Sequence, residues 1–147
     1  MSAQKEIKDG LVNFQIKAVD LINSSLQSPK SVHTNEQSFS FSISVEQKLD
    51  QNNKCLIVVT HVEITSADDL DYKLATGSVA CLFAIDNYSD VVKIEDGKIN
   101  INQGITDVLN SISFSTTRGV LSQALKGTYL HNAILPVIDP KTYKKLQ

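Results

Sequence analysis

Apolar and polar residues alternate along much of the first 85 residues, and this alternation predicts β-strands. In the clearest segment, residues 38–45, serines occupy every second position and apolar residues occupy the others. The apolar set is Phe39, Phe41, Ile43 and Val45. A period of two with one apolar side is typical of an antiparallel strand that packs one face on a core and leaves the other in water.

The first strand is expected to begin at Phe14 and to contain an irregularity. The alternation runs through Ile16 and Ala18 and then changes phase at Val19, as a β-bulge would make it do. Pro29 ends this segment, because proline cannot donate to a strand ladder.

Two further strands are expected over residues 56–64 and 72–85, separated by an acidic turn. The second half of the later segment is apolar on both faces, so this strand should be central or covered on both sides. The next residues, 91–102, are expected to form a short extended link with a turn at Asp96-Gly97.

Residues 104–125 have helical spacing, with two apolar stripes almost opposite each other. The first stripe contains Ile105, Val108, Leu109, Ile112, Thr116, Gly119 and Val120. The second contains Phe114, Leu121 and Leu125. A surface helix needs one apolar face, so two faces indicate either a helix buried within its own chain or one shared between subunits. We assign Phe114, Leu121 and Leu125 to an interface between subunits.

The ends of this helix carry ordinary signals. Asn102 is a suitable N-cap, and Lys126-Gly127 is a typical stop. Strands first and a helix after them predict a single α+β domain over residues 1–147, built as a four-stranded antiparallel meander followed by a long helix and a short C-terminal segment.

Charge and composition exclude several classes of protein. The net charge of −2 argues against a nucleic-acid surface, which needs a basic patch. The N-terminal residues lack an apolar run and no window approaches a membrane span, so we expect a cytoplasmic protein that does not insert into membranes. Cys55 and Cys81 lie on expected strands without metal or redox spacing, so we interpret them as buried apolar residues.

No constellation of residues specifies catalysis. Glycines are scattered singly, and His33, His61 and His131 lack second ligands at metal spacing. A serine, histidine and carboxylate triad could be assembled from many serines here, so it has no value without geometry. Asp68, Asp69 and nearby Asp71 are interpreted as a solvated turn or, alternatively, a docking surface for a basic partner. We therefore expect no enzyme, no metal and no cofactor.

Several short motifs occur in an order that resembles the SecB-like export chaperones. They are FQI at residue 14 with the break at Pro29, VVTHVEITSADDL over residues 58–70, and LFAI over residues 82–85. Arg118 within the helix, KGTY at residue 126 and AILPV at residue 133 complete the series. Each motif is weak alone, but the collinear set covers about 125 residues and is fairly specific.

This resemblance implies a four-stranded antiparallel sheet, a long helix and a homotetramer built as a dimer of dimers. It also implies an ATP-independent holdase that binds unfolded or precursor polypeptides along apolar grooves, without a cofactor or catalysis. The residues assigned to peptide binding are apolar residues of the second strand and of the segment after the helix: Phe39, Phe41, Tyr129, Leu130, Ile134 and Leu135.

The chain departs from the family where the motor SecA docks. The family's acidic positions correspond to Asn23, Gln27 and Thr76, none of them charged, and the acidic turn is kept only as Asp68 and Asp69. SecA is thus a possible partner, and a second hypothesis is a dedicated partner-binding protein, for instance for a toxin–antitoxin pair or a phage. A small-ligand site or enzyme on the same fold is the third.

Overall fold

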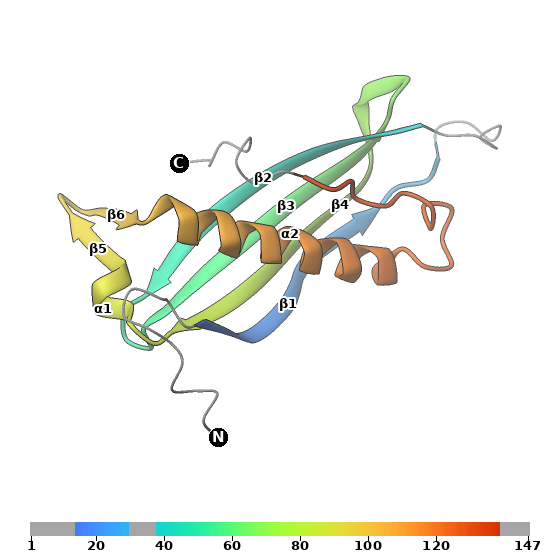
Figure 1. Cartoon of the computed structure of the whole chain (residues 1–147). Coiled ribbons are helices and arrows are strands. Elements are labelled where there is room, and N and C mark those ends of the chain that lie inside the picture. Colours follow the sequence, from blue (N-terminus) through green and yellow to red (C-terminus); the bar gives the residue numbers. More distant parts are fainter. Residues whose placement is uncertain (1–13, 30–37, 139–147) are drawn as a thin grey trace.

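A computed structural model describes residues 14–29 and 38–138, and shows one twisted sheet crossed by one long helix (Figure 1). The elements, in chain order, are β1 (Phe14–Leu26), β2 (Phe39–Asp50), β3 (Cys55–Ser66), β4 (Asp69–Ile85), α1 (Tyr88–Val91), β5 (Val92–Glu95), β6 (Lys98–Ile101) and α2 (Gln103–Ala124). The α+β class, with a four-stranded antiparallel sheet followed by a long helix, is confirmed.

The order of the strands differs from a simple meander. Strands β2, β3 and β4 follow one another through hairpins, but β1 pairs with β4, so the order is β1-β4-β3-β2. This is a Greek-key arrangement, in which the connection between β1 and β2 takes the chain to the opposite edge of the sheet. The long strand β4 is apolar on both faces in its second half, and it is central, as its pattern predicts.

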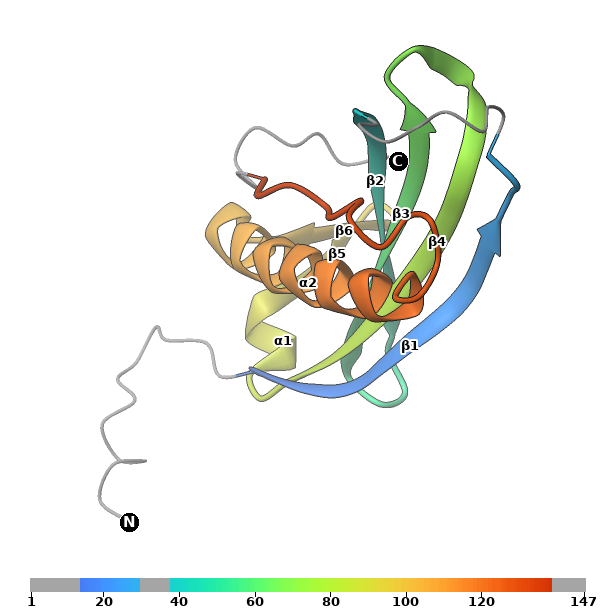
Figure 2. The ribbon, with the colours of Figure 1, turned by 90° about the vertical axis from the view of Figure 1, so that its right-hand side faces the viewer.

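The bulge in β1 is confirmed. The pairing of β1 with β4 shifts between Ile16 and Ala18, so Lys17 is the extra residue and Ala18 lies on the face opposite to Ile16. A second shift, between Leu21 and Asn23, was not expected. With the two shifts, β1 bends along the edge of the sheet (Figure 2).

Helix α2 lies across one face of the sheet, and the residues after it run back beside it (Figure 2). Asn102 is the N-cap, because its side chain accepts a hydrogen bond of 2.8 Å from the backbone N–H of Gly104. At the other end, Gly127 has φ +84°, a conformation that glycine adopts at helix ends. The extended link before the helix is a two-stranded hairpin, β5–β6, with its turn at Asp96-Gly97.

The sheet-facing side of α2 corrects the interpretation of its two stripes. Phe114, Leu121 and Leu125 pack on the chain's own sheet and are only 2%, 7% and 8% exposed. The reasoning that one chain has no use for this stripe is therefore wrong, and these residues are not an exposed subunit interface. Leu109 of the other stripe joins Phe114 in one core cluster, so the stripes are two sides of one broad buried face.

The helix approaches the sheet closely because the contact residues are small. Gly77 of β4 lies beneath Leu121, and a Cβ atom at residue 77 would be 2.5 Å from Leu121 Cδ2. On the helix side, Ser113 and Thr117 are fully buried, and the Thr117 hydroxyl donates to the Ser113 carbonyl at 2.6 Å. Glycine at residue 77 therefore serves close packing.

Candidate functional site

The candidate site is built on a cluster of nine buried residues, here called the second core, which lies beneath the C-terminal half of α2. It contains Val62, Ile64, Leu74, Ala75, Leu121, Leu125, Leu130, Ala133 and Leu135. Half-buried aromatic residues surround it: Phe39, Phe41, Tyr72 and Tyr129. Residues of three strands, the helix and the segment after the helix thus meet in one apolar region.

A pocket of about 120 Å³ opens beside the second core, between the end of β1 and the last turns of α2. Its lining residues are Ser24, Ser25, Leu26, Val62, Ile64, Ala75, Thr76, Gly77, Leu121, Ala124 and Leu125. Engineered apolar cavities of roughly 150 Å³ bind benzene, so one aliphatic or aromatic group fits a space of this size. Sequence reasoning missed this pocket, although a glycine inside an apolar strand is a known sign of a close approach.

The segment after the helix, residues 125–138, is fixed at its ends and leaves apolar side chains exposed between and beyond its anchors. Leu130 and Leu135 are buried at 0% and 4% exposure. The Arg118 guanidinium donates to the carbonyls of Leu135 and Pro136, at 2.9 and 3.1 Å. Ile134, by contrast, is 53% exposed.

Two tyrosines connect this region to the end of β1. The Tyr129 hydroxyl donates to the Gln27 carbonyl at 2.5 Å, and the Tyr72 hydroxyl donates to the Ser28 carbonyl at 2.6 Å. Burial, with Tyr72 as a second cause, raises the pKa of Tyr129, so its hydroxyl keeps the proton that it donates. The wall of the site and the edge strand are therefore joined by hydrogen bonds.

The six residues assigned to peptide binding occupy this one region but differ in exposure. Phe39, Phe41 and Tyr129 are half-buried and pack on the second core, whereas Leu130 and Leu135 are part of it. Ile134 is exposed. The two buried leucines can form the floor of a binding surface, and the other four present side-chain surface to solvent.

The edge strand β1 exposes an unusual amount of apolar surface. Five large apolar side chains on it are 39% to 54% exposed: Ile16, Val19, Leu21, Ile22 and Leu26. A sheet edge with exposed apolar residues is a ready surface for pairing with another chain.

The expected docking residues lie apart from the second core or carry no charge. Asp68 is exposed at the turn before β4, and Asp69, the first residue of β4, is half-buried. Asn23 and Gln27 are exposed beside β4. Thr76 is half-buried, with its hydroxyl 2.6 Å from that of Ser25.

Other site chemistries find little support in the part of the chain that the structure describes. Within residues 14–29 and 38–138, no three histidine, cysteine, aspartate or glutamate side chains gather as a metal site would require. Cys55 and Cys81 are both free and buried. Among these same residues, no helix is long and apolar enough to cross a membrane.

Comparison with known proteins identifies the fold. No protein-family model matches the sequence, and no curated protein sequence matches it. Among solved structures, the chain is similar to a SecB-like chaperone of Mycobacterium tuberculosis, which was solved in complex with a ChAD peptide from the HigA1 antitoxin. The TM-score is 0.52 at 12% sequence identity, over 85% of this chain and 87% of the chaperone. The chain therefore has the fold of a SecB-like chaperone.

Proposed function

We propose that this protein binds non-native polypeptides without ATP, as a cytoplasmic holdase. The observation that carries the proposal is the apolar region around the second core, where half-buried aromatic residues and exposed Ile134 adjoin an apolar pocket. Unfolded chains expose apolar side chains that folded proteins bury, so a region of this kind selects them. The SecB-like fold, found in a chaperone solved with a bound peptide, supports the same function.

Strand β2 supplies main-chain groups for such binding. Within the described residues β2 pairs only with β3, so its other edge presents backbone N–H and C=O groups. An extended client segment can add to this edge as a further strand, while its side chains contact Phe39 and Phe41. Main-chain pairing accepts many sequences, as a holdase requires.

We also propose that the protein associates with itself, as a dimer of dimers. Two surfaces support this assembly. The first is the free edge of β1 with its exposed apolar residues, and the second is the outward face of α2, where Val108 is 46% exposed beside small residues. Strand addition at β1 and helix packing through small residues are both common ways to join chains.

A dedicated partner-binding role is the second candidate. Asn23, Gln27 and Thr76 leave the edge next to β4 without the acids that the SecB-like family uses to dock SecA, so a link to protein export is the weaker form of the proposal. The chaperone of similar fold was solved with a peptide from one antitoxin. Co-purification distinguishes the two, because a general holdase retains many precursors and a dedicated protein retains one or two.

Light scattering of an aggregating client tests the proposal with a matched pair of variants. Ile134 and Ile94 are 53% and 49% exposed, but only Ile134 belongs to the segment after the helix. Ile134→Asp is expected to raise the concentration needed for half-suppression about fivefold, the equivalent of about 1 kcal/mol of binding free energy. Ile94→Asp on β5 should leave it unchanged.

Equal effects of the two substitutions would contradict the location of the site. No suppression by the unmodified protein at equimolar tetramer would contradict the holdase itself.

A further inference from the structure

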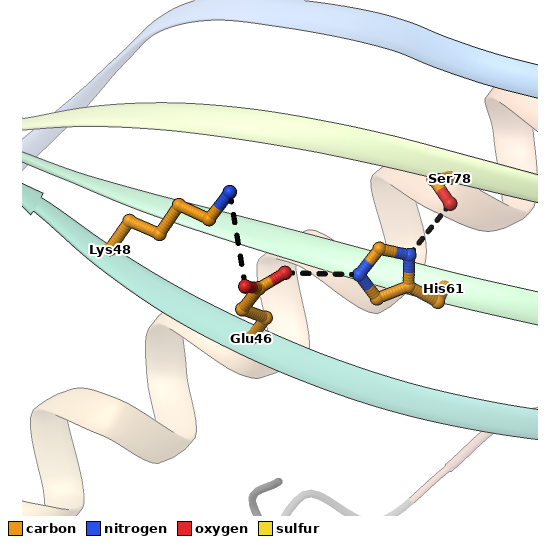
Figure 3. A network of polar contacts seen from close by, with 4 residues as sticks. All are labelled: Glu46, Lys48, His61 and Ser78. Atoms are coloured by element: carbon orange, nitrogen blue, oxygen red, sulfur yellow. Dashed lines mark hydrogen bonds and ion pairs between the residues drawn. The ribbon is translucent and has the colours of Figure 1, made fainter. Parts of the chain in front are cut away.

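The face of the sheet that α2 leaves uncovered carries a hydrogen-bonded row of side chains from β2, β3 and β4 (Figure 3). The Ser78 hydroxyl lies 2.7 Å from His61 Nδ1, and His61 Nε2 lies 3.2 Å from a carboxylate oxygen of Glu46. Lys48 Nζ is 3.8 Å from the other oxygen of that carboxylate. Serine, imidazole and carboxylate are thus connected in series.

The chemistry of the carboxylate fixes the direction of these bonds. An ionised carboxylate only accepts hydrogen bonds, so Nε2 of a neutral His61 carries the proton and donates it to Glu46. Nδ1 is then an acceptor, and the Ser78 hydroxyl donates to it. This is the relation between nucleophile, base and orienting carboxylate that serine acyl transfer requires, with the two ring nitrogens exchanged relative to the chymotrypsin arrangement.

An open depression of about 310 Å³ lies over the row. Its lining residues are Ser42, Ser44, His61, Val62, Glu63, Thr76, Gly77 and Ser78. Ser78 lines the depression but is only 5% exposed, so a bulky group cannot surround its hydroxyl. The hydroxyls of Ser42 and Ser44 come from β2, where Ser44 pairs with His61 in the sheet register.

We propose that Ser78 is an activated nucleophile and that this depression accepts small esters, so that short acyl groups transfer to Ser78. This activity lies beyond the proposed polypeptide binding and is independent of it, because the row occupies the opposite face of the sheet from α2 and the second core.

The transfer balances without any further reactant. Ser78 Oγ forms a bond to the ester carbonyl carbon while its proton passes to His61 Nδ1. The bond from that carbon to the leaving oxygen then breaks, and the departing alcohol takes the proton from Nδ1. Water attacks the acyl-serine by the same route and releases the acid, which restores Ser78.

The surroundings also set the speed. Backbone N–H groups in the middle of β3 and β4 are engaged in the sheet ladder, so the nearest free donors for a developing oxyanion are serine hydroxyls of β2. Loss of one oxyanion-hole donor slows acyl enzymes about 100- to 1,000-fold. We therefore expect slow turnover of activated esters, with acylation as the readily measured step.

Two probes test the proposal on the full chain: an alkyl fluorophosphonate, read by peptide mass spectrometry, and p-nitrophenyl acetate, read by release of p-nitrophenol. The unmodified protein should form one phosphonyl adduct, on Ser78. Ser78→Ala should abolish it, and His61→Ala should slow it about 100-fold, the lower range for loss of a general base. Ser89→Ala and His131→Ala, which change exposed residues on other elements, are the matched controls and should label normally.

Glu46 is a positioning residue, and its substitution needs a separate measurement. Glu46→Gln should lower kcat for p-nitrophenyl acetate about tenfold and leave KM unchanged, a split that a general loss of structure would not produce. Absence of a Ser78 adduct in the folded wild-type protein, or an adduct that persists elsewhere at the same rate in Ser78→Ala, would overturn the proposal. Polypeptide binding would be unaffected by either result.

Discussion

Leu121→Asp is expected to lower the free energy of unfolding of the single chain by about 4 kcal/mol or more. Leu121 is 7% exposed in the second core and contacts Gly77 across the helix–sheet interface. Removal of a buried leucine side chain costs roughly 2 to 5 kcal/mol, and a carboxylate without a partner in the same place adds a further penalty. Since small domains have about 5 to 15 kcal/mol in total, the variant should be marginally folded.

Urea unfolding followed by circular dichroism measures this effect, and Val108→Asp is its control. Val108 lies on the same helix but is 46% exposed, so its substitution should change the unfolding free energy by about 0.5 kcal/mol or less. Sedimentation should show that Val108→Asp, and not Leu121→Asp, weakens association of otherwise folded chains. A Leu121→Asp protein with normal unfolding and altered association would return Leu121 to a subunit interface.

Gly77→Val is expected to cost about 1 to 3 kcal/mol, because its side chain must occupy the space of Leu121. A Cβ at residue 77 would be 2.5 Å from Leu121 Cδ2, a separation that real atoms do not reach without movement. No positive φ requires glycine here, so the effect reports on space alone. Gly119→Ala on the exposed side of α2, where nothing lies within 4 Å, should be neutral or stabilising.

A double-mutant cycle makes the reason for this cost measurable. When Leu121→Ala removes the methyl groups that the valine would strike, Gly77→Val should lose most of its penalty, which gives a coupling energy of about 1 kcal/mol or more. Additive effects of the two substitutions would mean that Gly77 and Leu121 do not share space.

The local features of the fold could be predicted from the sequence because local pattern determines them. The serine alternation around Phe41 defined the two faces of β2, and the phase change after Ile16 revealed the bulge. Asn102 marked the start of α2 by its capping chemistry. Each of these depends on residues within a few positions of one another.

Features that depend on distant pairing could not be predicted in this way. The pairing of β1 with β4 joins segments about 60 positions apart, and sequence adjacency favoured a meander instead. Which stripe of α2 faces the sheet depends on Gly77, far away in the chain. The Ser78–His61–Glu46 row likewise arises only from the register of three strands.

The candidate site was located in its region but not in its depth. All six assigned residues lie at or beside the second core, yet Leu130 and Leu135 are interior residues, and the pocket involves the end of β1, which carried no apparent signal. An apolar residue in a sequence gives no sign of whether it lines a binding surface or supports one, since both roles select the same side chains.

Binding of a labelled polypeptide in its unfolded and folded forms tests the central claim most directly. A fluorescent client that is reduced and carboxymethylated, so that it cannot refold, would be titrated with this protein in the absence of nucleotide and followed by fluorescence anisotropy. We predict saturable binding of the unfolded form, no binding of the native form, and weaker binding by the Ile134→Asp variant than by Ile94→Asp. Equal binding of both forms, or no binding of either, would contradict the account.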